Sequence, residues 1–373
     1  MIVSRAPVRI SFGGGGTDLE AYYGRFGGFV LSTAINRYCY VAASEPARGG
    51  IHIHSVGHPA RTSQTARTSL DDGPERLARA AISLLASEFG ELSQRGIGLT
   101  LASDVPPGTG LGSSSAMAVA LLHALTRYLG IPMAAAGIAE LACRLEIERL
   151  GMPIGKQDQY ASAFGGLNTI EFTSHRVQVN PLALSNHIRR ALQARLLLFA
   201  TGQRRNSSAI LSKQREDTRH KISTVTRLHE IKALGQAMRD ALLAEDLDAF
   251  GRLLDRAWHE KRRLSAAISN TRIDSWYIAA RAAGALGGKI TGAGGGGYLL
   301  LYTPPRHIDA VREAMRAYGL RELPFALESA GVCRLKRLPD EYQVPLALPP
   351  AVRNARPPHR LALPFLEGEV SHG

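Results

Sequence analysis

Hydrophobic and polar residues alternate in three stretches of the first half of the chain, "IVSRAPVRISF", "RYCYVAAS" and "GIGLTLASDV". A period of two places every second side chain on one face, so each stretch predicts a strand. Apolar residues recur with the helical period in three other segments, 75–89, 115–128 and 134–150. The first half is therefore expected to combine a sheet with helices.

The second half shows the same combination. The stretches "GGLNTIEF", "ARLLLFATG" and "YLLLYTPP" predict strands, and two long helical patterns fill most of residues 203–285. A helix is expected from about His307 to Tyr318, followed by a final strand around "PFALESAGVCRL". Because a strand, a helix and a strand in this order suit an α+β layer, we expect one domain at 1–188 and a second at 189–338.

Proline becomes frequent at the C-terminal end of the chain. Residues 339–373 hold seven of the nineteen prolines. Proline lacks an N–H donor and interrupts both helices and sheets. We therefore expect an irregular, proline-rich tail at 339–373 and not a third domain.

The composition is that of an ordinary globular protein, with 373 residues, 45% hydrophobic and 21% charged. No apolar run approaches the ~18 residues that a membrane span requires, and the first residues show no leader pattern. Cys39, Cys143 and Cys333 lie too far apart to form a metal-binding pair and are expected to be small buried hydrophobes. We expect a cytoplasmic protein that does not associate with membranes.

A net charge of +13 raises the possibility of nucleic-acid binding. The lysines and arginines are scattered, however, and no aromatic residues are interleaved with a basic stripe, as binding of single strands requires. A solvated basic surface fits the sequence better, and it would also favour a small anionic substrate. We expect no nucleic-acid partner, and the sequence leaves open a monomer or a homodimer.

Three glycine-rich stretches stand out: "RISFGGGGTD" at 9–18, "PPGTGLGSSSA" at 106–116 and "KITGAGGGG" at 289–297. Glycine lets another molecule approach the main chain closely, because it has no side chain. One such run is a turn, whereas three predict a shared binding site.

The middle stretch has the pattern expected of a phosphate-binding loop. Gly108, Gly110 and Gly112 follow a strand, and three serines then open a helix, where serine is a good N-cap. The free N–H groups and the dipole of such a helix start bind anions. The pattern is neither a Walker A motif nor a dinucleotide fingerprint. Taken alone, the loop is equally well interpreted as the tight entry turn of a core helix.

Two carboxylates follow this loop. Glu146 has Ala142 and Leu150 as its helical neighbours, which turns it toward an apolar face where a carboxylate needs a partner such as Mg²⁺. Asp158 stands at the start of a short helix, which fits either a helix-capping aspartate or a base that accepts a proton from an attacking hydroxyl. Phosphoryl transfer demands little of its base, so an ordinary aspartate suffices.

The three glycine-rich stretches, in this order, resemble the three motifs of the GHMP small-molecule kinases, the superfamily of galactokinase, homoserine kinase, mevalonate kinase and phosphomevalonate kinase. Further stretches, among them "GKQDQYASAFGG" and "LLLFATGQRRNSSAILSKQ", resemble the bacterial D-glycero-D-manno-heptose 7-phosphate kinases. Galactokinases have Glu-His where this chain has Gly15-Gly16, so those sugar contacts are absent here.

The resemblance implies a two-domain fold, with an N-terminal ribosomal-protein-S5-like α/β domain and a C-terminal ferredoxin-like α+β domain. It implies a kinase that uses ATP and Mg²⁺ to phosphorylate the anomeric hydroxyl of D-glycero-D-manno-heptose 7-phosphate to the 1,7-bisphosphate, for nucleotide-activated heptose. A kinase for another sugar or small alcohol, and a noncatalytic protein that binds a ligand or nucleic acid, are the alternatives.

The resemblance also implies roles for individual residues. Asp158 is the expected catalytic carboxylate with Arg9 beside it, and Ser114 and Glu146 are the expected Mg²⁺ ligands. The ATP phosphates are expected at Pro107, Gly108, Thr109, Gly110, Leu111, Gly112, Ser113, Ser114 and Ser115. The acceptor is expected at Gly14, Gly15, Gly16, Thr17, Asp18, Tyr160, Thr291, Gly292, Gly294 and Gly295. Arg204 and Arg205 are the candidates for its far-end phosphate, although paired loop arginines are often only solvated.

Two histidines and two tryptophans are interpreted as structural residues and not as ligand-binding ones. His52 and His54 are two residues apart on a predicted strand, without the cysteines or carboxylates that would complete a metal site. Trp258 and Trp276 lie in helical patterns and are expected in the core.

Overall fold

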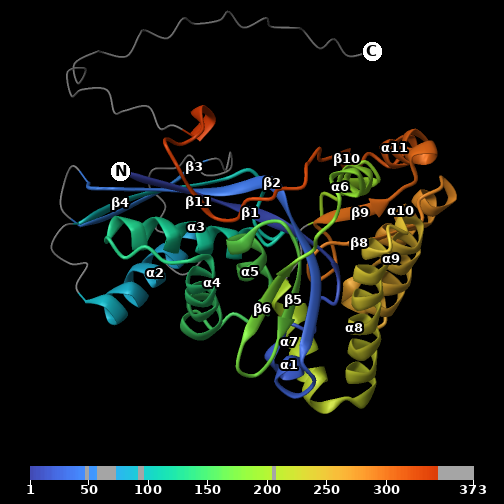
Figure 1. The fold of residues 1–373 in the computed structure, drawn as a ribbon, viewed down its shortest axis with the longest axis horizontal. Helices are drawn as coiled ribbons and strands as arrows, with labels where there is room; N and C mark the ends of the chain where they lie inside the picture. The colour runs from blue at the N-terminus through green and yellow to red at the C-terminus, as the bar shows by residue number, and fades with distance from the viewer. Residues whose placement is uncertain (47–49, 57–72, 91–95, 204–206, 343–373) are drawn as a thin grey trace, which may run out of the picture. The chain divides into compact units, whose positions relative to one another are not determined.

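Two long antiparallel strands, β1 (Ile2–Gly13) and β2 (Gly28–Ser44), form the centre of the larger sheet in the computed structural model of the chain (Figure 1). The structure describes residues 1–46, 50–56, 73–90, 96–203 and 207–342. Met1–Tyr342 form one compact unit. None of the described helices is long and apolar enough to cross a membrane.

The strands of the larger sheet are arranged around β2. Its C-terminal half pairs with β4 and its N-terminal half with β5, so that the sheet divides along this strand. Among the described strands the order is β11-β1-β2-β4-β3, with β6 beside β5, and of their pairs only β3–β4 is parallel. The remaining strands are β3 (Ile51–Val56), β4 (Ile97–Ser103), β5 (Leu167–Phe172), β6 (Val177–Pro181) and β11 (Cys333–Leu335).

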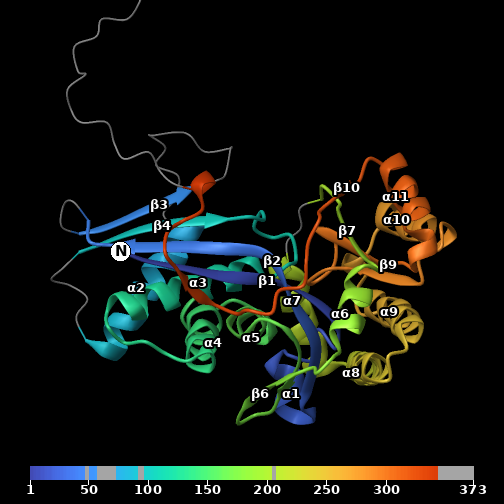
Figure 2. The ribbon, with the colours of Figure 1, turned by 45° about the horizontal axis from the view of Figure 1, so that its top comes forward.

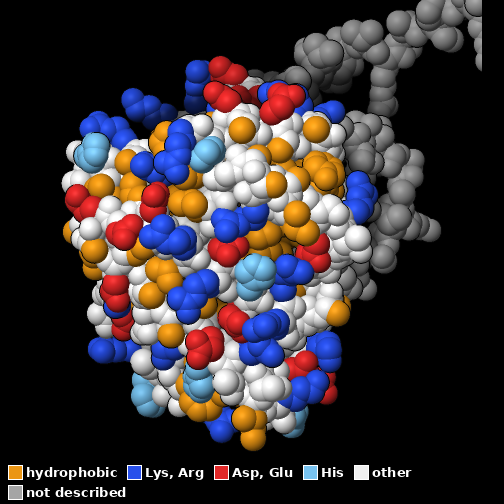
Figure 3. All heavy atoms as spheres, turned by 90° about the vertical axis from the view of Figure 1, so that its right-hand side faces the viewer, with side chains coloured by type: hydrophobic (Ala, Val, Ile, Leu, Met, Phe, Trp, Pro, Cys, Tyr) orange, Lys and Arg blue, Asp and Glu red, His pale blue; other side chains and the backbone are white. Residues whose placement is uncertain are grey.

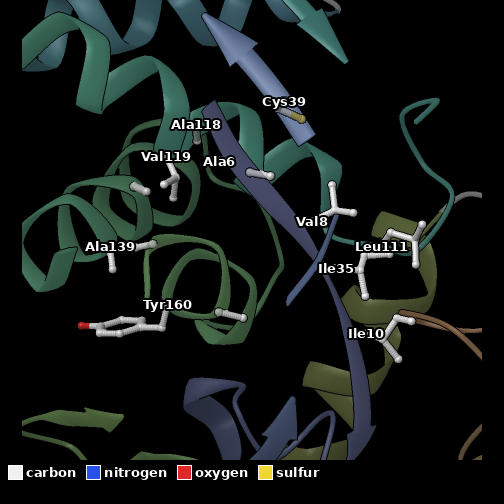
Figure 4. Close-up of a cluster of buried hydrophobic side chains, with 14 of the residues drawn as sticks. Ala6, Val8, Ile10, Ile35, Cys39, Leu111, Ala118, Val119, Ala139 and Tyr160 are labelled. Carbon is white, nitrogen blue, oxygen red and sulfur yellow. The ribbon is translucent and has the colours of Figure 1, made fainter. Parts of the chain in front are cut away.

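The helices of the first half lie on one face of the β1–β4 region (Figures 1 and 2). They are α2 (Pro74–Phe89), α3 (Ser113–Tyr128), α4 (Ala135–Cys143) and α5 (Gln157–Phe164), and a short helix, α1 (Glu20–Phe26), connects β1 and β2. Alternate residues of β1 face them, so Ala6, Val8 and Ile10 pack in one buried cluster with Val119 of α3 (Figure 4). The strand predicted from the alternation in this stretch is thus present as β1.

The second half is built on a smaller antiparallel sheet of order β10-β7-β9-β8. Its strands are β7 (Leu196–Ala200), β8 (Gly287–Ile290), β9 (Tyr298–Tyr302) and β10 (Arg321–Glu322). The helices are α6 (Asn186–Gln193), α7 (Ser207–His220), α8 (Ile222–Leu243), α9 (Leu247–Arg262), α10 (Thr271–Ala282) and α11 (Ile308–Ala317). Both faces of β7 and β9 are buried, which explains their continuous apolar sequences. Trp258 and Trp276 lie in this core, as expected.

Three predicted elements differ in the structure. The final strand is wrong over most of its length: it is reduced to β11, and β11 pairs with β1 of the larger sheet, whereas β10 completes the smaller one. Residues 203–285 form four α-helices among the described positions instead of two. The helix predicted for 134–150 is α-helical only to Cys143 and continues as a π-helix, η1 (Arg144–Arg149).

The opposite face of the β1–β4 region is covered in part by the end of the described chain. Leu338 packs in a small cluster with Val3, Tyr40 and Ala102, and the Tyr342 hydroxyl donates to Asp104 at 2.8 Å. His52 and His54 lie on β3, at an edge of the same sheet. Of the cysteines, Cys39 and Cys143 are buried as predicted, whereas Cys333 on β11 is only partly buried.

Lysine and arginine side chains are dispersed on the face seen from the right of Figure 1. Figure 3 shows them among acidic and apolar side chains and not gathered in one stripe. This face has the mixed character that the scattered sequence positions predicted.

Candidate active site

One cavity is lined by all three glycine-rich stretches. Gly15 and Gly16 come from the loop after β1, Gly108, Gly110 and Gly112 from the loop before α3, and Gly292 from the loop after β8. Side chains from both halves of Met1–Tyr342 complete its wall. The glycines far apart in the sequence therefore share one site.

Arg9 and Asp158 form an ion pair in this cavity. The Arg9 Nε donates to Asp158 Oδ1 at 2.7 Å, and one Arg9 terminal nitrogen lies 2.5 Å from the same oxygen. The Arg9 side chain is buried at 4% exposure, whereas Asp158 is 22% exposed and so is accessible from the cavity. The second Arg9 terminal nitrogen donates to the Gly110 carbonyl at 2.7 Å. The guanidinium thus fixes a carboxylate relative to the glycine loop.

The loop before α3 places main-chain N–H groups of the first helical turn at the cavity. Gly112, with φ of 74°, is the N-cap of α3, and no side chain caps this helix. The predicted serine cap is therefore wrong, since Ser113, Ser114 and Ser115 form the first helical turn. A glycine cap leaves the first N–H groups of the helix available to an anion, with the positive end of its dipole behind them.

Glu146 is fully buried at one wall of this cavity. Its Oε1 accepts a hydrogen bond from Ser114 at 2.8 Å and its Oε2 accepts one from Gln159 at 2.7 Å. Burial raises the pKa of this carboxyl to about 7, even though these hydrogen bonds oppose the rise. The residue stands in the π-helical segment η1, a kind of local widening that is frequent at functional sites.

Asp18 lies on the acceptor side of the cavity and is 3% exposed. It accepts hydrogen bonds from the main-chain N–H of Gly16 at 2.8 Å and from the Gln157 side chain at 3.0 Å. Burial raises the pKa of Asp18, and the nearby Asp158 charge adds to the rise. The Gly155 backbone packs so closely against this carboxylate that a Cβ there would overlap it.

Two lysines approach the cavity from the second half. The Lys289 Nζ donates to the carbonyls of Ser11 at 2.8 Å and of Phe12 at 3.3 Å, which ties β8 to β1. Burial, together with the nearby charge of Arg9, lowers the pKa of Lys289 to about 7. The Lys261 Nζ donates to the Gly292 carbonyl. Both lysines line the cavity.

The third glycine loop packs against the middle one. The Thr291 hydroxyl donates to the Thr109 carbonyl at 3.2 Å. A Cβ at Gly297 would overlap the same carbonyl. The two loops are thus in main-chain contact, which only glycine allows at this position.

Several predicted residues do not line the cavity. Tyr160 lies among the buried side chains near Ala139 (Figure 4), and its hydroxyl donates to Glu140 at 2.7 Å. The Thr17 side chain is fully buried, and its hydroxyl hydrogen-bonds with main-chain groups of Gly14 and Phe29. Tyr160 therefore packs in the core, and Thr17 stabilises the main chain of the first glycine loop. Gly14, Pro107, Thr109, Leu111, Thr291, Gly294 and Gly295 also stand outside the cavity lining.

Leu111 illustrates how such a residue contributes indirectly. Its side chain is fully buried in one cluster with Ile35 and Ile10 (Figure 4), and its carbonyl accepts a hydrogen bond from the Arg9 main chain at 2.9 Å. It therefore anchors the glycine loop to β1. Arg204 and Arg205 lie outside the described residues, and the helix that follows them, α7, contributes Ser207 and Ser208 to the cavity wall.

Sequence reasoning missed several side chains of the cavity wall, among them the polar side chains of Ser11, Gln157, Gln214, Lys261 and Lys289. Lys289 could have been noticed, because it is a lysine in a short strand that precedes a glycine run. Gln214 gives no comparable signal, since a glutamine in a polar helix is ordinary.

The chain matches two family models in succession. The model of the GHMP kinases N terminal domain matches residues 76–166, and that of the GHMP kinases C terminal domain matches residues 238–320.

Individual relatives agree with these matches. A D-glycero-alpha-D-manno-heptose 7-phosphate kinase of Campylobacter jejuni is 31% identical over 336 residues, which cover 89% of this chain and 98% of the relative. A galactokinase of Mycobacterium tuberculosis is 29% identical over 371 residues, which cover 88% of this chain and 98% of the relative. Among solved structures, a D-glycero-D-manno-heptose 1-phosphate kinase of Bacteroides thetaiotaomicron superposes with a TM-score of 0.73 at 27% identity, covering 91% of this chain and all of that one.

Proposed function

The chain belongs to the GHMP kinase family, and we propose that it transfers the γ-phosphoryl group of ATP to the anomeric C1 hydroxyl of D-glycero-D-manno-heptose 7-phosphate. Membership makes the protein an ATP-dependent phosphotransferase with an alcohol group as acceptor. The choice of a heptose phosphate rests on the similarity to the Campylobacter jejuni heptose 7-phosphate kinase.

The Arg9–Asp158 pair is the observation that carries the mechanism. Asp158 reaches the cavity, and Arg9 holds one of its oxygens. In the proposed reaction the acceptor O–H bond breaks and its proton passes to Asp158, a new O–P bond forms, and the bond between the γ-phosphorus and the β–γ bridging oxygen breaks to release ADP. A positioned base of this kind contributes typically 10²- to 10⁴-fold to the rate.

The phosphates are proposed to lie at the start of α3. No side chain caps the first turn of α3, which therefore offers main-chain N–H groups, and Lys261 of the second half brings positive charge to the same cavity. Donors aimed at developing charge stabilise the transition state without further reorganisation. Arg9 adds to this field because it contacts both the loop and the base.

The residues present fit a Mg²⁺ ion. Glu146 is a buried carboxylate at the cavity wall, where burial raises its pKa and a bound cation would favour its charged form, and the Ser114 hydroxyl lies 2.8 Å from it. Mg²⁺ is usually bound through one or two carboxylates together with substrate phosphates and water. Glu146 and Ser114 would hold it, and it would neutralise phosphate charge when bound.

A panel assay tests the proposal. The purified protein is given Mg²⁺ and ATP with heptose 7-phosphates, unphosphorylated heptose, galactose, fucose and mevalonate, and ADP release is followed, with Asp158→Asn as the control. Turnover confined to heptose 7-phosphates, and lost in the control, supports the proposal. Turnover of galactose or another alcohol alone would keep the kinase and overturn the substrate. Phosphorus NMR of the product identifies the phosphorylated position.

A further inference from the structure

Three buried polar atoms in the cavity wall have no hydrogen-bond partner among the described residues: Ser11 Oγ, Gln157 Oε1 and Gln214 Nε2. A buried polar atom without a partner costs free energy, and nearly all such atoms in native proteins are satisfied by protein, water or ligand. Three of them in one cavity therefore indicate a polar ligand that completes their hydrogen bonds.

The three side chains surround the same two glycines. A Cβ at Gly15 would lie 3.5 Å from Ser11 Oγ and 3.7 Å from Gln157 Nε2. A Cβ at Gly16 would overlap Gln214 Nε2. The Gly15-Gly16 pair, which lacks side chains, thus lets these three polar side chains approach the main chain closely at the cavity wall.

The orientation of Gln157 is fixed by its neighbour. Its Nε2 donates to Asp18 Oδ2 at 3.0 Å, and its main-chain N–H donates to the same oxygen at 3.3 Å. Because its amide nitrogen is engaged, its Oε1 is left as an acceptor. Gln214 Nε2 supplies a donor, and the Ser11 hydroxyl can do either. This set suits hydroxyl groups, each of which both donates and accepts.

The subsite adjoins the proposed base. Gln157 and Asp158 are consecutive residues of the first turn of α5, and both line the cavity. Gln214 comes from α7 of the second half, whereas Ser11 comes from β1. A ligand held by all three would connect the two halves and present an adjacent hydroxyl to Asp158.

We propose that Ser11, Gln157 and Gln214 recognise ring hydroxyls of the acceptor and determine its specificity. This inference rests on the proposed function, because it assumes that the cavity binds a polyol next to Asp158. Removal of one such hydrogen bond, with its buried partner left unsatisfied, weakens binding by about 10- to 100-fold.

The test compares Gln214→Met and Gln157→Met, which keep the side-chain volume, with Gly15→Ala. Gly15 does not have a positive φ, and its new methyl group would meet only ordinary contacts at 3.5 Å or more, so Gly15→Ala folds but fills the subsite. Gln178→Met, on the exposed side of β6, is the matched control. Thermal unfolding first verifies that each variant folds.

We expect all three subsite variants to raise the acceptor KM by about 10-fold or more while the ATP KM stays within about twofold. Deoxy analogues of the acceptor give a second test. The wild type should have a lower kcat/KM for the analogue that lacks the recognised hydroxyl than for the acceptor itself. In Gln214→Met or Gln157→Met the two values should become similar. The assays use whichever acceptor the wild type phosphorylates. A raised KM for a different sugar would overturn the heptose substrate and support the subsite, whereas folded variants with an unchanged acceptor KM would overturn the subsite.

Discussion

Two nitrogens of Arg9 converge on one carboxylate oxygen of Asp158, Oδ1. Its Nε and one terminal nitrogen both approach Oδ1, at 2.7 and 2.5 Å. The other oxygen, Oδ2, faces the start of α3, where it lies 3.1 Å from the position of a Cβ at Gly112. The carboxylate is thus held at one oxygen and directed toward the glycine loop by the other.

This geometry predicts the effect of Asp158→Asn. The amide keeps the shape of the side chain but cannot accept a proton, so kcat should fall by about 10²-fold or more while the binding of ATP and acceptor stays near normal. Single-turnover kinetics and calorimetric titration measure the two quantities separately. Undiminished turnover would remove Asp158 from the role of base.

Arg9→Lys tests whether Arg9 acts through Asp158. Lysine keeps the charge but cannot reach Asp158 and the Gly110 carbonyl with separate nitrogens, as the guanidinium does. We expect kcat to fall by about 10-fold or more in the wild-type background and much less in Asp158→Asn, because groups that act as a unit are non-additive. Equal losses in both backgrounds would show that Arg9 acts independently of the carboxylate.

Lys289 should make the stability of the ligand-free protein depend on pH. Its pKa is about 7 in the folded protein and 10.5 in the unfolded chain, so between these values only the unfolded chain holds the proton. The contribution of this lysine to the free energy of unfolding therefore rises with pH, by about 1.4 kcal/mol per unit, across this window. Below pH 7 both states are protonated and the contribution is constant.

Urea unfolding of the wild type and of Lys289→Met at pH 7.5, 8.5 and 9.5 checks this slope. The difference between the two proteins should change by about 1.4 kcal/mol per unit in favour of the wild type. Lys336→Met, at an exposed position, is the control and should show no such slope. A difference independent of pH would mean that Lys289 keeps an ordinary affinity for its proton.

Ser114→Ala and Glu146→Gln should weaken the response to Mg²⁺. Each removes one proposed ligand, and Glu146→Gln also removes the negative charge that attracts the ion. We expect the Mg²⁺ concentration for half-maximal rate to rise by about 10-fold or more, with the larger effect in Glu146→Gln. Free Mg²⁺ is titrated at saturating ATP. An unaltered Mg²⁺ requirement in both variants would place the ion elsewhere.

Replacing Arg204 and Arg205 by alanine tests the proposed site for the far-end phosphate. An arginine–phosphate pair is strong and bidentate, so its loss should weaken the binding of the phosphorylated sugar by about 10-fold or more and leave ATP binding within about twofold. Titrations of the double variant with each ligand give both values. Equal losses for sugar phosphate and ATP would contradict the assignment.

The sequence predicted those parts of the fold that depend on local patterns. The two-domain GHMP kinase fold expected from the motifs is confirmed by the family models and by the superposition at a TM-score of 0.73. The division at residue 188 stays a prediction, and that residue lies inside α6. The pairing of β11 with β1 could not be predicted, because it joins residues about 330 positions apart through a strand of three residues.

The cavity was predictable where glycines or buried charges mark it. Glu146 was located because a carboxylate on an apolar face is unusual, although the π-helix around it was not foreseen. Tyr160 and Thr17 were expected at the acceptor, and the structure places both outside the cavity lining, with their hydroxyls bonded to Glu140 and to the Gly14 carbonyl. Gln157 and Gln214 were missed because the significance of a glutamine depends on partners that only the tertiary structure reveals.

The hydrogen bonds from Lys289 to β1 and from Thr291 to the Thr109 carbonyl have a consequence for a protein split into two fragments. Each joins the two halves of the site through a main-chain carbonyl. The acceptor therefore remains when the side chain of the accepting residue is substituted. A chain cut in the segment between β6 and α6 would leave these acceptors and donors on separate polypeptides. Phosphoryl transfer by two co-expressed fragments would then report directly on their noncovalent reassembly.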